Sequence, residues 1–259
     1  MNGVPRVSIS VVSHGQAALA APLLAQLDAL AGTYPLEIIL TENLADAPAC
    51  PVTFRHAAVT HVRNRQAVGY GANHNAAFRH ATSGYFCALN PDVRFEGNPF
   101  EPLRAQVAAT PGVAGPRVLS PRGTVEDSAR HVPSLTGVLA RHALRRYQPD
   151  YDPAVPVQPV DWLAGMCLMF DAGTFAALEG FDERFHMYCE DVDICLRTHL
   201  LGCAVQWVQE AVIVHDAQRG SRRSLRPLLW HLRSMFRLVN SRPYRSYMHK
   251  TSTRPASRE

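Results

Sequence analysis

The stretch VSISVVSHGQAALAAPLLAQLDALAGTYPLEIIL, residues 7–40, contains the pattern that decides the fold. Val7–Val12 is a run rich in β-branched residues, and apolar residues then recur at helical spacing over Ala17–Leu30. A second apolar run, Leu36–Leu40, follows after a short break. The order strand, polar turn, helix, strand predicts an α/β fold with a mostly parallel, Rossmann-like central sheet flanked by helices.

Polar turns follow three of the predicted strands, and in a parallel sheet the ligands bind beyond the carboxyl ends of the strands. The third of these strands is the apolar run Tyr85–Leu89. The residues of the three turns are Ser13, His14 and Gly15, then Glu42 and Asn43, then Asn90, Pro91 and Asp92. We therefore expect a ligand site at the edge where these turns meet.

A glycine-rich segment, GYGANHN at residues 69–75, opens a predicted helix that runs to about His80. A turn of this kind lets backbone N–H groups approach an anion. The third glycine of the dinucleotide fingerprint is missing, and the segment does not follow the first strand. The pattern therefore argues against a Rossmann dehydrogenase.

Asp92 is a candidate ligand for Mg²⁺ or Mn²⁺ at the end of the third strand. Both ions prefer hard oxygen ligands and keep several waters, so one carboxylate together with phosphate oxygens suffices. His215 ends another predicted strand and would complete the site or bond a phosphate. The alternatives are that Asn90–Asp92 is only a turn and that His215 is a structural residue.

Three acids, Glu190, Asp191 and Asp193, stand at the start of a predicted helix. They would oppose the helix macrodipole favourably, which is the structural alternative. Like charges this close raise one another's pKa and make a better proton acceptor near neutral pH. Asp193 is spaced to pair with Arg197, which leaves Asp191 as the preferred general base and Glu190 as the second candidate.

The composition, 47% hydrophobic and 19% charged residues, fits an ordinary folded protein of 259 residues. We expect one domain over residues 1–224, followed by a basic amphipathic helix and tail over residues 225–259. From Arg219 onward eleven Lys and Arg residues face a single acid, Glu259. This tail predicts contact with an anionic surface, such as the cytoplasmic face of a membrane. The alternative is a helix packed on the domain with a solvated basic face.

Six cysteines without a C-x-x-C pair, and no apolar stretch of the length needed to span a bilayer, favour a cytoplasmic protein with reduced thiols. The N-terminus has no signal-peptide pattern, so we do not expect secretion. Any membrane contact would be peripheral. The basic tail matches no nucleic-acid recognition motif, which disfavours nucleic acid as a partner.

The region Arg117–Pro159 is rich in Pro, Arg and His and shows little periodicity. We expect a long loop there, with a short helix near Leu135–Arg146, that helps to shape an acceptor site. Val160–Phe170 returns to strand-like composition. Val205–Val208 and Ala211–Val214 are predicted as two short strands.

Several short sequence motifs together resemble those of the family 2 glycosyltransferases with the GT-A fold, and most closely those of the bacterial L-rhamnosyltransferases of O-antigen and polysaccharide assembly. They are Val11–Gly15, Gly69–Asn75, Leu89–Asp92, Val160–Trp162 with Gly165, Gly180–Asp182, Phe185–Arg197, His215–Gln218 and Trp230–Ser234. Each motif alone is weak evidence for this resemblance. Their ordered occurrence over residues 7–240 is specific.

The resemblance implies transfer of L-rhamnose from dTDP-L-rhamnose to a saccharide or lipid-linked saccharide acceptor, with inversion at the anomeric carbon. Asp92 and His215 would hold Mg²⁺ or Mn²⁺ against the diphosphate, and Asp191 would deprotonate the acceptor hydroxyl. The residues expected at the donor are Ser13, His14, Gly15, Glu42, Asn43, Gly69, Gly71, Asn75, Asn90, Trp162 and Gly165.

Two alternatives stay open. The same fold would serve a UDP- or GDP-sugar, because donor choice depends on a few side chains that a sequence does not place. The second alternative is a non-catalytic binding subunit of a polysaccharide assembly complex. The presence of Asp92, Asp191 and His215 argues against it, because a binding module need not keep all three. A nucleotidyltransferase is disfavoured, because the turn after the first strand lacks a Gly-rich loop with Lys or Arg.

Overall fold

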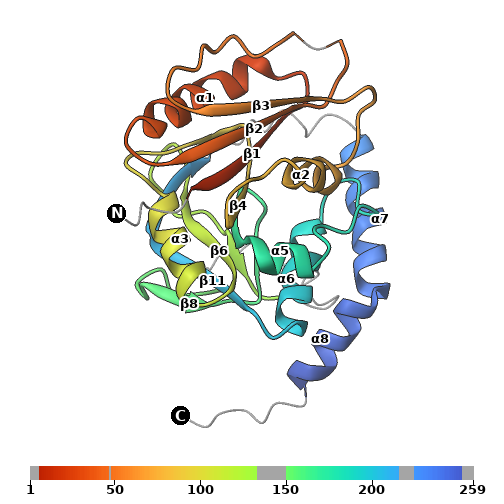
Figure 1. The fold of residues 1–259 in the computed structure, drawn as a ribbon. Helices are drawn as coiled ribbons and strands as arrows, with labels where there is room; N and C mark the ends of the chain where they lie inside the picture. Colours follow the sequence, from red (N-terminus) through yellow and green to blue (C-terminus); the bar gives the residue numbers. More distant parts are fainter. Residues whose placement is uncertain (1–5, 47, 133–149, 216–224, 253–259) are drawn as a thin grey trace.

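The computed structural model describes residues 6–46, 48–132, 150–215 and 225–252. These residues form a nine-stranded central sheet with helices on both faces, and a separate two-stranded ribbon (Figure 1). The sheet consists of β1 (Val7–Ser13), β2 (Leu36–Glu42), β3 (Ala58–Arg63), β4 (Tyr85–Leu89), β5 (Val93–Arg94), β6 (Gly112–Leu119), β8 (Val157–Pro159), β10 (Cys167–Asp171) and β11 (Ala204–His215). The ribbon consists of β7 (Ala129–Arg130) and β9 (Trp162–Leu163). The helices are α1 (Ala17–Ala31), α2 (Tyr70–Phe78), α3 (Phe100–Ala109), α5 (Ala172–Ala177), α6 (Glu190–Leu200), α7 (Leu225–Asn240) and α8 (Arg242–Ser252).

Neighbouring strands follow the order β3, β2, β1, β4, β10, β6, β11, β5, and β8 pairs with β11 outside this path. The pairs β3–β2, β2–β1, β1–β4 and β6–β11 are parallel, whereas β10 is antiparallel to both β4 and β6. Because a single reversed strand separates them, β4 and β6 run in the same direction. The predicted mostly parallel sheet is confirmed, and β1, β2, β4 and β11 all end at one edge.

Side chains alternate between two buried layers. On β1, Val7, Ile9 and Val11 are fully buried in the layer that α1 and α3 cover. The intervening Ser10 faces the other layer, where its hydroxyl lies 2.8 Å from Nδ1 of His74 on α2. Helices α2, α5, α6, α7 and α8 lie on that second side of the sheet (Figure 1).

Two strand predictions need correction. The region predicted as two strands, Val205–Val208 and Ala211–Val214, is one strand, β11, with a bulge between Val208 and Val212. The polar residues inside the bulge read as a turn, but the shift in register lets the strand continue. The predicted strand Val160–Phe170 is divided into β9 and β10 by a break at residues 164–166.

The predicted long loop Arg117–Pro159 is also corrected in its described parts. Strand β6 continues to Leu119, and β7 and β8 pair with β9 and β11. Short strands of two or three residues leave no periodicity in a sequence, because their pairing depends on distant partners. The helix predicted near Leu135–Arg146 lies outside the described residues.

The C-terminal helices pack on the domain. Leu238 of α7 is fully buried, and Tyr247 of α8 is 7% exposed. The Tyr247 hydroxyl donates to Asp161 Oδ1 at 2.9 Å. The amphipathic helix predicted over Leu225–Val239 is confirmed as α7. None of the helices in the described ranges combines the length and apolar content that crossing a bilayer requires.

Candidate functional site

The ends of β1 and β2 are joined through one asparagine. The Asn43 amide donates to the Ser13 carbonyl at 2.8 Å. The Asn43 side chain lies 3.1 Å from Nδ1 of His14 and donates to the Val68 carbonyl at 2.9 Å, while the Val68 amide donates back at 3.0 Å. Asn43 therefore fixes the predicted donor turns against the segment that precedes α2.

Glu42 lies at the last position of β2 rather than in a turn, and it is 6% exposed. Its carboxylate accepts a bond from Arg63 Nε at 2.7 Å, from the end of the neighbouring strand β3. Gly15 follows β1 with a φ of +71°, a left-handed backbone that favours glycine. The edge thus presents backbone groups together with one ion pair, in which Glu42 is buried and Arg63 is half exposed.

The glycine-rich segment packs closely on a distant part of the chain. A Cβ at Gly69 would lie 2.6 Å from the His186 carbonyl oxygen, and one at Gly71 would lie 2.6 Å from Phe181 Cβ. The Asn75 amide donates to the Phe181 carbonyl and accepts from the Phe181 amide, both at 2.8 Å. These contacts give all three residues a packing role, and their contact with a nucleotide stays a prediction.

Asp92 and His215 come together, as the sequence predicted. Nε2 of His215 lies 3.3 Å from Asp92 Oδ2, and Nδ1 lies 3.2 Å from Glu126 Oε2. Burial lowers the pKa of His215, but the bonds to Asp92 and Glu126 outweigh it and raise this pKa above its ordinary value. The other Asp92 oxygen, Oδ1, is buried without a hydrogen-bond partner within the described chain.

This cluster suits a cation bound by Asp92 and His215. A six-coordinate Mg²⁺ with bonds of about 2.1 Å holds adjacent ligands about 3 Å apart, close to the spacing of these two side chains. The unpartnered Oδ1 is a free acceptor. The imidazole, however, lies between the two carboxylates, and no three His, Cys, Asp or Glu side chains converge on one point in the part of the chain that is described. In such a site Asp92 and His215 would leave most of the coordination sphere to phosphate and water.

A chain of backbone bonds connects this cluster to the acidic pair. The Asn90 amide donates to the Met166 carbonyl at 2.9 Å. The adjacent Gly165 amide donates to Asp191 Oδ2 at 3.1 Å, and the Gly165 carbonyl accepts from the Tyr70 hydroxyl at 2.7 Å. The turn between β9 and β10 thus brings Asn90 and Asp191 to the same edge of the sheet.

Glu190 and Asp191 are two coupled carboxyl groups in different surroundings. Burial and the nearby charge of Asp191 raise the pKa of Glu190 to about 8, and its Oε2 has no partner among the described residues. Burial also raises the pKa of Asp191, while the amides of Val192 and Gly165 and the charge of Arg130 oppose that rise. Of the two carboxyl groups, Asp191 is therefore the one whose ionised form has several stabilising partners, whereas Glu190 has only its own backbone amide.

Asp193 is outside this pair, as its spacing predicted. It accepts a bond from Arg197 Nε at 2.7 Å, and this ion pair is buried at the acid. The same guanidinium donates to the carbonyls of Leu178 and Gly180. Asp193 therefore ties α6 to the loop after α5.

The backbone is strained directly before the acidic pair. Tyr188 and Cys189 have φ values of +71° and +67°. Of the described residues other than glycine, only Glu179 shares this left-handed conformation. Such conformations cost about 1 to 3 kcal/mol each and persist where the surrounding structure holds them, often at functional sites. Here they set the angle at which α6 presents Glu190 and Asp191.

The structure adds neighbours that the sequence did not reveal. Arg130 lies over the ring of Trp162 at 5.3 Å and pairs with Asp127 at 3.0 Å. Glu126 contacts His215. Both residues come from the region Arg117–Pro159, whose lack of periodicity gave no indication of where these side chains would lie. Trp162 itself donates to the His131 carbonyl at 3.0 Å, so its indole N–H is occupied.

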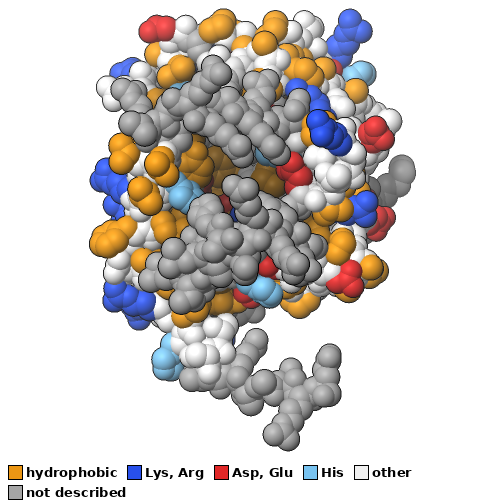
Figure 2. All heavy atoms as spheres, turned by 180° about the vertical axis from the view of Figure 1, so that it is seen from behind, with side chains coloured by type: hydrophobic (Ala, Val, Ile, Leu, Met, Phe, Trp, Pro, Cys, Tyr) orange, Lys and Arg blue, Asp and Glu red, His pale blue; other side chains and the backbone are white. Residues whose placement is uncertain are grey.

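Figure 2 shows the face opposite to that of Figure 1, where apolar side chains, with acidic and histidine side chains beside them, are visible between the residues drawn in grey. A surface that offers both kinds of side chain suits a ligand that carries both rings and charged groups.

No family model matches the chain. It is 26% identical over 246 residues to rhamnosyltransferase WbbL of Escherichia coli K12, a match that covers 90% of this chain and 92% of that protein. It is 31% identical over 147 residues to the N-acetylglucosaminyl-diphospho-decaprenol L-rhamnosyltransferase of Mycobacterium tuberculosis, covering 52% of this chain and 47% of that protein. Among solved structures, mannosyltransferase PcManGT of Pyrobaculum calidifontis, in complex with GDP-Man and Mn²⁺, matches 97% of this chain and 70% of its own, with a TM-score of 0.64 at 17% identity.

The fold and the relatives define the chain as a glycosyltransferase with the GT-A fold. Within that class its sequence is similar, over nearly its whole length, to a rhamnosyltransferase. The predicted fold and the predicted enzyme class are confirmed.

Proposed function

We propose that the protein transfers L-rhamnose from dTDP-L-rhamnose to a hydroxyl of a lipid-linked saccharide, with inversion, in cell-surface polysaccharide biosynthesis. The observation that carries this proposal is the buried carboxyl pair Glu190–Asp191, bonded through Gly165 to the strand edge that also holds Asp92 and His215. The similarity to rhamnosyltransferases supports rhamnose as the sugar.

The donor would lie across the ends of β1, β2 and β4. Ser13, His14, Gly15, Glu42 and Asn43 form the edge nearest the nucleotide. The residues proposed to flank the rest of the donor are Gly69, Gly71, Asn75, Asn90, Trp162 and Gly165. The bonded pair Glu42–Arg63 offers an ionic group at the base or ribose, because Arg63 is half exposed.

Asp92 and His215 would hold Mg²⁺ or Mn²⁺ at the diphosphate, and the Mn²⁺ in the mannosyltransferase complex supports this choice. Such a cation, when bound, neutralises charge that develops on the departing diphosphate. The unpartnered Asp92 Oδ1 and the 3.3 Å spacing to His215 are the features that fit it. Glu126 would hold the His215 ring through Nδ1.

Asp191 is the proposed general base. Its ionised carboxylate accepts the proton of the acceptor hydroxyl as the oxygen forms a bond to the anomeric carbon. The bond from that carbon to the diphosphate oxygen breaks, and the nucleoside diphosphate leaves from the opposite face. Glu190 keeps its proton near neutral pH, so the pair carries a single negative charge, and that charge also favours the developing positive charge on the sugar.

The exposed face of α7 would rest on an anionic membrane that carries the acceptor. Leu228, Leu229, Leu232 and Phe236 are 55–72% exposed and share one side of the helix. Residues 225–252 contain no acid and six Lys or Arg residues. Apolar insertion and attraction to anionic lipid both favour this contact.

Vesicle co-sedimentation tests that contact. Wild type should bind vesicles containing anionic lipid better than neutral ones, and Phe236→Gln should weaken binding, whereas Val125→Gln, at an exposed valine outside α7, should not. Equal binding of both vesicle types would contradict membrane docking.

Thermal unfolding with nucleotide sugars tests the donor. Purified protein would be heated with dTDP-, UDP- and GDP-sugars, in Mn²⁺ and in EDTA. A ligand that binds only the folded state raises the free energy of unfolding by RT ln(1 + [L]/Kd). We expect the largest rise with dTDP-L-rhamnose in Mn²⁺. Stabilisation by a UDP- or GDP-sugar instead would replace the donor, and no response to any would favour a non-catalytic subunit.

A further inference from the structure

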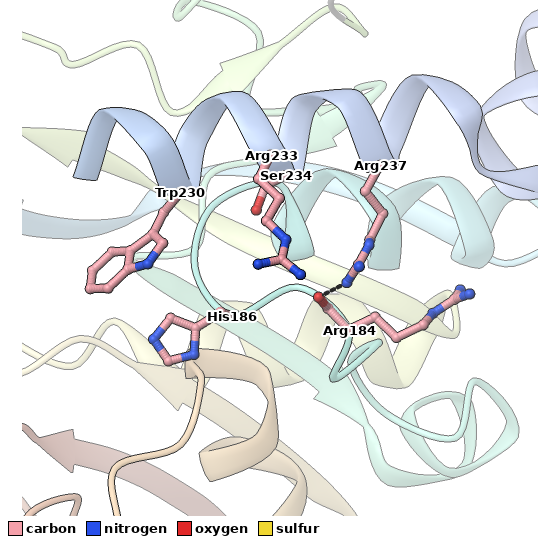
Figure 3. A pocket seen from close by; sticks show the side chains of 6 residues that line it. All are labelled: Arg184, His186, Trp230, Arg233, Ser234 and Arg237. Carbon is pink, nitrogen blue, oxygen red and sulfur yellow. Dashed lines mark hydrogen bonds between the residues drawn. The ribbon is translucent and has the colours of Figure 1, made fainter. Parts of the chain in front are cut away.

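A pocket of about 310 Å³ lies outside the donor edge described above. It is formed between α7 and the segment that leads into α6. Its lining residues are Arg184, His186, Trp230, Arg233, Ser234 and Arg237. Figure 3 shows Trp230, Arg233 and Arg237 extending from α7 toward the loop that carries Arg184 and His186.

Two of the three arginines bring uncompensated positive charge. The Arg184 side chain is bonded to both carboxylate oxygens of Asp182, and in Figure 3 it extends away from the other guanidinium groups. Arg237 donates to the Arg184 carbonyl and lies over the Phe185 ring at 6.0 Å. Arg233 has no hydrogen bond or ion pair with any described residue, and α7 contains no acid. The pocket therefore carries two positive charges without a carboxylate partner.

The walls of the pocket are held in place by contacts that do not involve these charges. The Ser234 hydroxyl donates to the Met187 carbonyl at 2.8 Å, and Ser234 is 6% exposed. The rings of Trp230 and His186 lie 5.0 Å apart. Helix α7 is therefore fixed on the loop, and the pocket is formed before any ligand arrives, which reduces the ordering cost of binding.

The pocket is close to the acidic pair. The His186 carbonyl accepts from the Tyr70 amide at 3.0 Å, and the Tyr70 hydroxyl bonds Gly165, whose amide bonds Asp191. Five residue steps separate His186 from Asp191, so their Cα atoms are at most about 18 Å apart. A ligand that fills the pocket can therefore extend one sugar or two toward the general base.

We propose that this pocket binds the diphosphate of the lipid-linked acceptor. A diphosphate esterified at both ends carries two negative charges, which match Arg233 and Arg237, and guanidinium groups bind phosphate oxygens in pairs. The exposed apolar side of α7 begins beside these arginines and faces the medium where the lipid would be. This inference rests on the proposed function, because the diphosphate identifies the site only if the acceptor is lipid-linked.

Fluorescence titration with farnesyl diphosphate tests the site. Of the three tryptophans, Trp230 is 37% exposed, whereas Trp162 and Trp207 are 8% and 2% exposed, so it is the one that reports on the pocket. The titration is run in EDTA with saturating dTDP, which excludes metal-dependent binding at the donor edge. Inorganic pyrophosphate and farnesol are titrated in parallel.

We expect farnesyl diphosphate to bind better than either comparison compound. Arg233→Gln should weaken binding at least tenfold, and Arg233→Lys should weaken it less because it keeps the charge. Arg55→Gln, at an exposed arginine near α1, should leave it unchanged. Equal binding by wild type and the double variant Arg233→Gln/Arg237→Gln would overturn the site, as would the absence of binding by wild type. If pyrophosphate bound as tightly as farnesyl diphosphate, the assignment of the pocket to a lipid-linked ligand would be overturned.

Donor binding tests the proposed function separately from the pocket. The same variants are heated with dTDP-L-rhamnose and Mn²⁺, and their stabilisation should equal that of wild type, which also shows that they are folded. If no nucleotide sugar stabilises wild type, the donor proposal fails, whereas Arg233-dependent binding of farnesyl diphosphate would still support the pocket.

Discussion

Glu190→Gln should change how the stability of the protein depends on pH. The pKa of Glu190 is raised from an ordinary value of 4.5 to about 8 in the folded state, by burial and by the charge of Asp191. Folding therefore takes up a proton between these values, so this group's contribution to stability is complete below pH 4.5 and is lost as pH rises through 8. At about 1.4 kcal/mol per pH unit, the loss across the interval reaches about 5 kcal/mol. Glutamine has nearly the same shape and no charge, so the variant should not show this loss.

The assay is urea unfolding of wild type and Glu190→Gln at pH 5, 6.5 and 8. The difference between the two free energies of unfolding isolates the Glu190–Asp191 pair, because the titrating groups outside the pair are common to both proteins. We expect it to shift in favour of the variant by several kcal/mol from pH 5 to pH 8. A difference that stays constant within 0.5 kcal/mol, on the order of one surface substitution, would refute the argument that Glu190 holds a proton in the folded protein.

Two further predictions concern the framework that positions the site. Gly112→Ala should destabilise the fold by about 3 kcal/mol or more, because the new Cβ would lie 2.0 Å from the Ala204 carbonyl oxygen at a φ of +149°. Urea unfolding measures this loss. Gly84→Ala is the control that should be tolerated, because a Cβ there meets nothing within 4 Å. Asp28→Asn should cost about 1.5 to 3 kcal/mol at pH 7, because the Asp28 carboxylate accepts three backbone amides from residues 55–57. Burial raises the pKa of Asp28, but these amides outweigh it and lower the pKa below its ordinary value. The carboxylate therefore stabilises the fold above that ordinary value and loses this effect as the pH falls. The difference in the free energy of unfolding between Asp28→Asn and wild type should thus be smaller at pH 3.5 than at pH 7.

The sequence predicted the edge at which the site forms because parallel strands impose it. Ser13, Asn43 and Asp92 each follow an apolar run, and runs that alternate with helices pair in parallel and end together. Asp191 and Asp193 could be separated by spacing alone, since Arg197 lies one helical turn after Asp193. These inferences need only local periodicity and one rule of topology.

The remaining features depend on contacts that no local pattern encodes. The roles of Gly69 and Gly71 in packing become visible only when residues more than 100 positions later are placed against them. The charge of Arg130 acts on Asp191, and Glu126 contacts His215. Both residues come from a region without periodicity. The division into β9 and β10 depends on the break at residues 164–166, which is too short and apolar to be distinguished from a continuous strand in the sequence.

The proposed role of Asp191 is that of the general base in a transfer from dTDP-L-rhamnose. The most direct measurement is the rate of dTDP release from dTDP-L-rhamnose with Mn²⁺ and a short-chain lipid-linked saccharide, in wild type and Asp191→Asn, with donor affinity measured in both. We expect unchanged donor affinity and a rate lower by about 10² to 10⁴ in the variant, the usual contribution of a general base. A variant that keeps its rate within about tenfold of wild type would contradict it.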